Sequence, residues 1–311
     1  MAKYTLKEVK TNADVKIWLH VDRPIYKDYK NWVCPLDNDI LAVFDPAKNK
    51  KFRHGEAIRW YVVDQAGNAV GRIAAFYDTN ASDDYEQPTG GCGFFESIDN
   101  QEVANMMFDA CRDWLKAKGM EAMDGPINFG SRDAWWGLLV DGYDYEPLYT
   151  NPYHPPYYKA LFENYGFQNY FNQNTYLWKV YEDDLSEIAK SKAERVAATE
   201  GYRIEDIRHT DLKVAAENLR TIYNKAWALF TGVNPMTEQE AQKLVATLKP
   251  IIDPNIIFFA YHNDQPISFF VMVPDLNCII GRFTTLNSVM DTCKDALLSQ
   301  GIWLTQLPIN A

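Results

Sequence analysis

The pattern of apolar and polar residues predicts that the chain opens with a short strand. Residues 4–9 (YTLKEV) alternate as a short strand does, and residues 13–29 indicate a helical or irregular region. An ordered loop is expected over residues 31–51, where Pro, Asp and Asn punctuate the chain. Two β-rich runs, 58–63 and 69–77, then flank the short turn DQAGN. This arrangement predicts an antiparallel hairpin.

The clearest periodicity predicts a helix that ends before Gly119. Its apolar positions share one helical face: 103, 106, 107, 110, 111, 114 and 115. Asp99 and Glu102 form a D-x-x-E pattern, which predicts the cap at the start of this helix. The runs 92–97 and 121–129 on either side of it predict strands. Strand, helix, strand is a crossover that places two strands parallel and adjacent.

The segment that follows the crossover is rich in Gly, Pro and aromatic residues. It covers residues 130–156 and predicts a long loop. A helix over 156–165 is expected to end at Gly166, and residues 175–181 predict a closing strand. The charged, Ala-rich run 182–200 predicts a linker helix.

Beyond the linker, the order of elements starts again. A strand at Tyr202 and a hairpin at Ile256 each lie 198 positions after their counterparts at Tyr4 and Ile58, which indicates a duplicated unit. Helices are expected between them, over 212–230 and 238–248, and the second run of the hairpin covers 267–273. The residues after 275 are too few for a second crossover, helix and closing strand. The expected organisation is a complete lobe (1–181), a linker helix (182–200) and a partial, truncated second lobe (201–311).

Composition narrows the class of protein. With 311 residues, 47% of them hydrophobic, the chain is long enough for two domain cores. It has no apolar run near the ~18 residues of a membrane span, and its charged N-terminus lacks a signal peptide's apolar run, so we expect a cytoplasmic protein with no membrane partner. Five scattered cysteines favour reduced thiols over disulfides or a metal site. The net charge of −11 disfavours nucleic acid as a partner.

The element order resembles that of the GNAT superfamily of acyl-CoA N-acyltransferases. Residues 160–167 (ALFENYGF) resemble the "LYEKLGF" segment in which the last helix of a GNAT domain meets its next strand. Together with VGRI at 70–73, the likeness covers most of 1–181, and residues 202–275 look like the first half of a second GNAT unit. With WVCPL at 32–36, the pattern is similar to bacterial two-lobed GNAT-like proteins of unassigned activity. The expected fold class is therefore α/β with a mixed sheet.

The resemblance implies acetyl-CoA or another acyl-CoA as the donor. Its pantetheine arm would wedge between the strands 92–97 and 121–129, with the diphosphate on the N-terminus of the helix between them. The family's glycine-bearing turn is replaced here by SIDNQEVA (97–104), which has two carboxylates and no glycine and counts against conventional CoA binding. The implied cofactor contacts are Phe95, Ser97, Asn100, Gln101 and Asn128.

The resemblance also implies catalytic positions. Glu96 stands where many family members place a base, whereas the usual tyrosine acid is replaced by Phe162. Tyr158 lies four residues earlier on the same helix face and is the substitute acid. The aromatic loop is expected to form an acceptor pocket or, alternatively, to pack against the second lobe. The predicted substrate contacts are Trp135, Trp136, Tyr153 and Tyr157, and His154 is a further base or hydrogen-bond donor.

Three functions remain open on these grounds. The first is an acyl-CoA-dependent N-acyltransferase that acts on a small amine. The second is a GNAT-fold binding or scaffold protein that has lost catalysis, which the altered turn and Phe162 favour. Amino-acid transfer from aminoacyl-tRNA to a cell-wall precursor is the third, and the acidic balance argues against it. An incomplete second lobe would expose strand edges and apolar surface, which predicts either a homodimer through that lobe or a poorly soluble protein.

Overall fold

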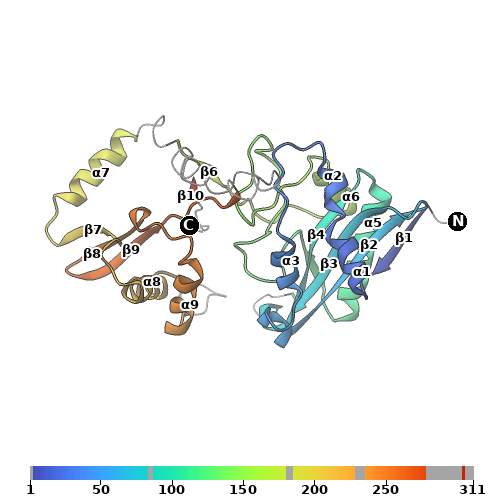
Figure 1. Ribbon diagram of the computed structural model, residues 1–311, viewed down its shortest axis with the longest axis horizontal. Helices are drawn as coiled ribbons and strands as arrows, with labels where there is room; N and C mark the ends of the chain where they lie inside the picture. Colours follow the sequence, from blue (N-terminus) through green and yellow to red (C-terminus); the bar gives the residue numbers. More distant parts are fainter. Residues whose placement is uncertain (1–2, 83–86, 180–184, 228–234, 278–302, 305–311) are drawn as a thin grey trace. The chain divides into compact units, whose positions relative to one another are not determined.

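The computed structural model describes residues 3–82, 87–179, 185–227, 235–277 and 303–304. The chain forms two compact units, Met1–Gln173 and Asn174–Ala311 (Figure 1).

Unit 1 is built on a five-stranded mixed sheet in the order β1-β2-β3-β4-β5 (Figure 1). Its strands are β1 (Tyr4–Glu8), β2 (Gly55–Asp64), β3 (Ala69–Asp78), β4 (Thr89–Ser97) and β5 (Ala122–Asp124). The first four pair antiparallel in sequence order. β5 pairs parallel to β4, with Thr89 opposite Ala122. The expected hairpin and the expected parallel pair are both confirmed.

Helices cover both faces of this sheet. The helices are α1 (Asn12–Leu19), α2 (Asp22–Tyr26), α3 (Asp37–Val43), α4 (Thr79–Ser82), α5 (Gln101–Ala117) and α6 (Tyr158–Tyr165), with a 3₁₀ turn at Lys50–Arg53. α5 and α6 pack with Trp60 and Val62 of β2 in one core. α1 and α3 pack with the neighbouring Tyr61 and Val63 in a second core. Alternate side chains of a strand point to opposite faces of the sheet. Because both faces of β2 are covered, its residues 60–63 are all apolar or aromatic.

The N-terminus of α5 differs from the expected cap. Asn100 is the N-cap, and its side chain accepts a hydrogen bond from the Val103 N–H at 3.1 Å. The D-x-x-E pattern of Asp99 and Glu102 is therefore not the cap, because the backbone enters the helix one residue later and asparagine caps as well as aspartate. Gly119 follows the helix with a φ of 84°, as expected of a C-terminal glycine.

Two predicted strands are shorter than expected. β5 ends at Asp124 because Pro126, two residues on, has no N–H for a ladder, although Ile127 N–H still donates to Cys92 O at 2.8 Å. Within residues 175–181, β6 (Tyr176–Leu177) pairs with β10 (Trp303–Leu304) in unit 2 and does not extend the first sheet. Residues 180–181 lie outside the described part of the chain.

Unit 2 repeats the opening of unit 1. It contains α7 (Glu187–Ala197), α8 (Leu212–Trp227), α9 (Glu238–Leu248) and a 3₁₀ turn at Pro254–Ile256, with strands β7 (Tyr202–Asp206), β8 (Ile257–His262) and β9 (Gln265–Val271). These strands form an antiparallel sheet in the order β7-β8-β9, with helices between the first and second strands, as in β1-β2-β3. The expected truncation after residue 275 falls mainly on residues 278–302 and 305–311, which lie outside the described residues.

Gly93 permits the close approach of β4 to the segment after β5. A Cβ at this position would lie 1.7 Å from the Ile127 carbonyl oxygen, which is backbone and cannot rotate away. We expect Gly93→Ala to lower the free energy of unfolding by about 1–3 kcal/mol or more, measured by urea denaturation. Gly130→Ala is the matched control, because the nearest atom to its Cβ would be the side-chain nitrogen of Asn128, at 3.0 Å. Equal denaturation midpoints for the two variants would contradict this interpretation.

Candidate active site

A bulge in β4 shapes the site. Arg72 pairs with Glu96 and Ala74 with Gly93, so two residues of β4, Phe94 and Phe95, oppose Ile73 alone. Phe94 has a φ of 51°, which is uncommon for a residue other than glycine. Bulges bend a strand and re-aim its side chains. This one lies at the end of β4 that extends past the short parallel pairing with β5.

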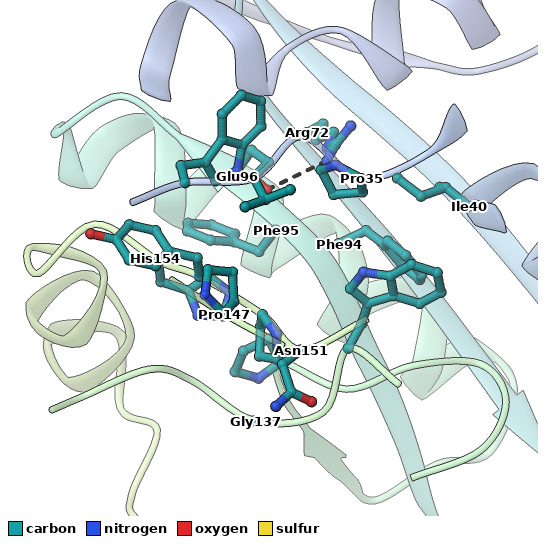
Figure 2. A pocket seen from close by; sticks show the side chains of 16 residues that line it. Pro35, Ile40, Arg72, Phe94, Phe95, Glu96, Gly137, Pro147, Asn151 and His154 are labelled. Atoms are coloured by element: carbon teal, nitrogen blue, oxygen red, sulfur yellow. Dashed lines mark hydrogen bonds and ion pairs between the residues drawn. The ribbon is translucent and has the colours of Figure 1, made fainter. Parts of the chain in front are cut away.

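A pocket opens beside this bulge (Figure 2). It encloses about 560 Å³, counting the open solvent at its mouth. Its polar side chains are Arg72, Glu96, Asn151 and His154. Its other walls are mostly apolar or aromatic: Trp32, Val33, Pro35, Ile40, Phe94, Phe95, Pro126, Trp135, Pro147, Pro152 and Tyr153. An apolar cavity with a few polar groups is the usual form of a small-molecule site.

Glu96 is a nearly buried carboxylate on the wall of this pocket. The Tyr158 hydroxyl donates to its Oε2 at 2.8 Å. Arg72 Nη2 lies 3.4 Å from its Oε1, and Figure 2 shows this contact. Burial is the main cause that raises the pKa of Glu96, to about 7, whereas Arg72 lowers it. Glu96 therefore exchanges a proton near neutral pH, which suits a general acid or base.

Arg72 is shared between two carboxylates. Its side chain is 2% exposed, and Nη2 lies 3.3 Å from Asp22 Oδ2 in addition to its contact with Glu96. Nη1 donates to the Leu19 and Trp18 carbonyl oxygens at 2.6 and 3.1 Å. Among the described residues, Asp22 Oδ1 has no hydrogen-bond partner. One buried cation thus faces two acidic groups, and the nearby Asp22 carboxylate is one cause that raises the pKa of Glu96.

Tyr158 supports Glu96 from behind the pocket. It is fully buried, and its hydroxyl also accepts a hydrogen bond from the Ser97 N–H at 2.8 Å. Burial raises its pKa well above the ordinary value for tyrosine, so the hydroxyl keeps its proton and continues to donate to Glu96. Tyr158 does not line the pocket, and its role as the acid stays a prediction.

His154 lies in the same pocket as Glu96. It is buried, and its Nδ1 accepts a hydrogen bond from the Leu139 N–H at 3.0 Å. Burial lowers the pKa of His154 to about 3, so its ring is neutral at physiological pH. A base this weak is poorly suited to take a proton from an amine. Of the two roles predicted for His154, the role of hydrogen-bond donor is therefore the better match.

The turn at the start of α5 is occupied by hydrogen bonds within the chain. Tyr158 accepts from the Ser97 N–H, and the Tyr157 hydroxyl donates to the Ser97 carbonyl oxygen at 2.7 Å. Asn100 caps the helix, and Gln101 Nε2 donates to the Leu161 carbonyl oxygen at 3.0 Å. With two carboxylates beside it and no glycine, this turn does not fit the diphosphate of CoA.

The other predicted contacts divide into two groups. Phe95, Trp135 and Tyr153 line the pocket. Trp136 does not line the pocket. The guanidinium carbon of Arg132 lies over its ring, 5.3 Å from the ring centre. The Asn128 side chain is buried elsewhere, and its Oδ1 has no hydrogen-bond partner among the described residues.

Several residues that line the pocket were not among the predicted site residues. Trp32, Val33 and Pro35 come from the WVCPL segment, and Arg72 comes from VGRI. Both segments contributed to the family resemblance, which was the only feature of the sequence that could have pointed to these residues. No feature of the sequence pointed to Asp22, which pairs with Arg72.

Within the part of the chain that is described, no helix is both long enough and apolar enough to cross a membrane.

Two curated proteins are similar to this chain, and no family model matches it. The chain is 28% identical over 275 residues to a bacterial ceramide synthase of Caulobacter vibrioides, covering 86% of this chain and 69% of that protein. It is 29% identical over 269 residues to protein YghO of Escherichia coli, covering 85% of this chain and 66% of YghO. The chain therefore spans about two thirds of the length of each.

Similar solved structures include acetyltransferases. A tandem GNAT protein from the clavulanic acid biosynthesis pathway has a TM-score of 0.44 at 12% identity, covering 96% of both chains. A GCN5-related N-acetyltransferase from Sphaerobacter thermophilus has a TM-score of 0.39 at 9% identity, covering 88% of this chain and 71% of that one. The sheet of unit 1, with four antiparallel strands and one parallel pair bridged by α5, agrees up to β5 with the element order that the sequence resemblance predicted. By its topology, the first unit of this chain is a mixed α/β domain.

Proposed function

We propose that this chain transfers an acyl group from a thioester to the amino group of a long-chain amine, with Glu96 as the base. The observation that carries the proposal is a carboxyl group of pKa about 7 on the wall of an otherwise largely apolar pocket. Removing a proton from an attacking amine is the task for which such a carboxylate is suited.

The acceptor is proposed to be longer and more apolar than the small amine expected from the sequence. Aromatic and proline side chains from residues 32–35 and 147–153 line the pocket, and they suit an alkyl chain better than a small polar molecule. One relative is named a ceramide synthase, and a ceramide is the amide of a fatty acid and a long-chain amino alcohol. Glu96 would hold the amino group, and the apolar walls would hold the chain.

The proposed step conserves atoms and electrons. The lone pair of the neutral amine attacks the thioester carbonyl carbon, and the electrons of the C=O π bond move to its oxygen. Glu96 accepts a proton from the nitrogen as the N–C bond forms. The carbonyl then re-forms, the C–S bond breaks, and the thiolate leaves with the bonding pair and takes up the proton that Glu96 accepted. The products are an amide and a free thiol.

The assay uses the full chain, a hexadecanoyl thioester and either a C18 2-amino-1,3-diol or ethanolamine, with the amide measured by mass spectrometry. We expect amide from the long-chain amine and little from ethanolamine. Turnover of ethanolamine alone would support the small-amine hypothesis instead, and the absence of amide from either acceptor would reject the transferase.

The same assay tests the donor. Because the turn before α5 does not fit a diphosphate, hexadecanoyl-pantetheine, which lacks it, should replace hexadecanoyl-CoA with less than about a tenfold change in kcat/KM. A fall of 100-fold or more would show that this chain binds the CoA diphosphate at another place.

A binding protein without catalysis is the second candidate, and the unsuitable turn before α5 is the observation that favours it. It predicts that the long-chain amine raises the melting temperature while no amide forms with any donor.

A further inference from the structure

The hydrogen bond between Leu139 and His154 assigns the tautomer of this histidine. The Leu139 backbone N–H can only donate, so Nδ1, 3.0 Å away, must accept. A neutral imidazole carries one N–H, which therefore lies on Nε2. The backbone of the aromatic loop thus holds the ring with its remaining donor at the far nitrogen.

The surroundings of this ring leave that donor for a ligand. His154 is 7% exposed and lines the pocket that also contains Glu96 (Figure 2). Its ring centre lies 5.7 Å from that of Tyr158, the residue that donates to Glu96. Among the described residues, no hydrogen-bond partner is found for Nε2. Nε2 is not among the fully buried polar atoms that lack a partner, so this nitrogen reaches the pocket, where a polar atom of a bound molecule can accept its hydrogen bond.

We propose that the Nε2–H of His154 donates a hydrogen bond to the carbonyl oxygen of the acyl group being transferred. This rests on the proposed function, in which negative charge develops on that oxygen as the amine adds. A preorganised donor in a site of low polarity stabilises such charge strongly. The two side chains then have different roles. Glu96 accepts the proton from the amine nitrogen, and His154 donates a hydrogen bond without transferring its proton.

The electrostatics of the ring agree with this division. Burial lowers the pKa of His154 to about 3, so the imidazole does not become charged in the range where Glu96 titrates. A neutral donor is also easier to bury in this largely apolar pocket than an imidazolium would be.

Two substitutions test the roles of the two ring nitrogens separately. In His154→Asn, the amide oxygen reaches the place of Nδ1 and can accept from Leu139 N–H, but nothing reaches the place of Nε2. His154→Gln places an amide N–H near the Nε2 position. We expect His154→Asn to lower kcat about 10²–10³-fold with KM changed less than about threefold, and His154→Gln to recover part of the loss.

Control measurements exclude a general structural effect. Both variants should unfold at similar urea concentrations, and the pH dependence of kcat should keep its midpoint, because His154 does not titrate there. Unchanged kcat in His154→Asn would overturn the proposal. A rise in KM alone would also overturn it, since the donor would then bind a part of the substrate that does not react.

A readout without turnover separates this inference from the proposed function. The chain contains five histidines, so ¹⁵N-histidine spectra are simple, and His154→Asn identifies the signal. We expect the proton on Nε2 and a shift of that signal when a short-chain N-acyl amino alcohol, the amide product, is added. If the chain transfers no acyl group but the signal shifts, the proposed function fails and the carbonyl site stands. A proton on Nδ1, or no shift at saturating amide, would overturn the site.

Discussion

Replacing Glu96 with glutamine is expected to lower kcat for amide formation about 10²–10⁴-fold. The variant keeps the size of the side chain and an oxygen that can accept from Tyr158, but it cannot take a proton from the amine. Steady-state rates with the long-chain amine measure the effect. Glu102→Gln is the matched control, because this carboxylate is exposed on the first turn of α5 and should change kcat less than about twofold. Glu96→Gln within threefold of the original rate would remove Glu96 from the base role.

The pH profile tests the same assignment. Only the carboxylate form of Glu96 accepts a proton, so kcat should rise with pH through a midpoint near 7 and level off above it. The Glu96→Gln variant should lose this dependence. Tyr158→Phe separates positioning from acid catalysis. The Tyr158 hydrogen bond lowers the pKa of Glu96, so its loss should move the midpoint to higher pH. A lower rate with an unmoved midpoint would support Tyr158 as the acid instead.

Replacing Arg72 with methionine is expected to reduce the free energy of unfolding by about 3–5 kcal/mol, measured by urea denaturation. Methionine fills similar space but leaves Asp22 and Glu96 buried without their cation. Arg112→Met is the control, because this arginine is half exposed and its ion pairs with Asp109 and Asp113 should contribute less than about 1 kcal/mol.

The loss in Arg72→Met should grow as the pH rises above 7. Arg72 lowers the pKa of Glu96, so in the variant this pKa lies above 7 and above its value in the unfolded chain. Over that range the folded variant binds a proton that the unfolded chain has released, so its stability falls further with pH. A difference that stays constant from pH 6 to pH 9 would contradict the coupling.

Most of the framework of unit 1 can be predicted from the local pattern of residues. Apolar side chains at helical spacing predicted α5, and two β-rich runs around a short turn predicted the hairpin of β2 and β3. These patterns are local consequences of which faces are buried, so they can be recognised without the fold. The strand–helix–strand order also implied that β4 and β5 are parallel, because short crossovers allow little else. Glu96 followed from its position on β4 and the family resemblance.

The surroundings of Glu96, by contrast, follow from contacts that form only in the folded chain. Arg72 meets Asp22 and Glu96, which lie 50 and 24 positions away in the chain, and no local pattern records such contacts. The same holds for the donor role of His154, which depends on the backbone N–H of Leu139, 15 positions earlier. A pKa depends on burial and on charges that folding brings together. The sequence therefore shows which groups can titrate. Their pKa values depend on the folded chain, because distant segments must come together to enclose the pocket.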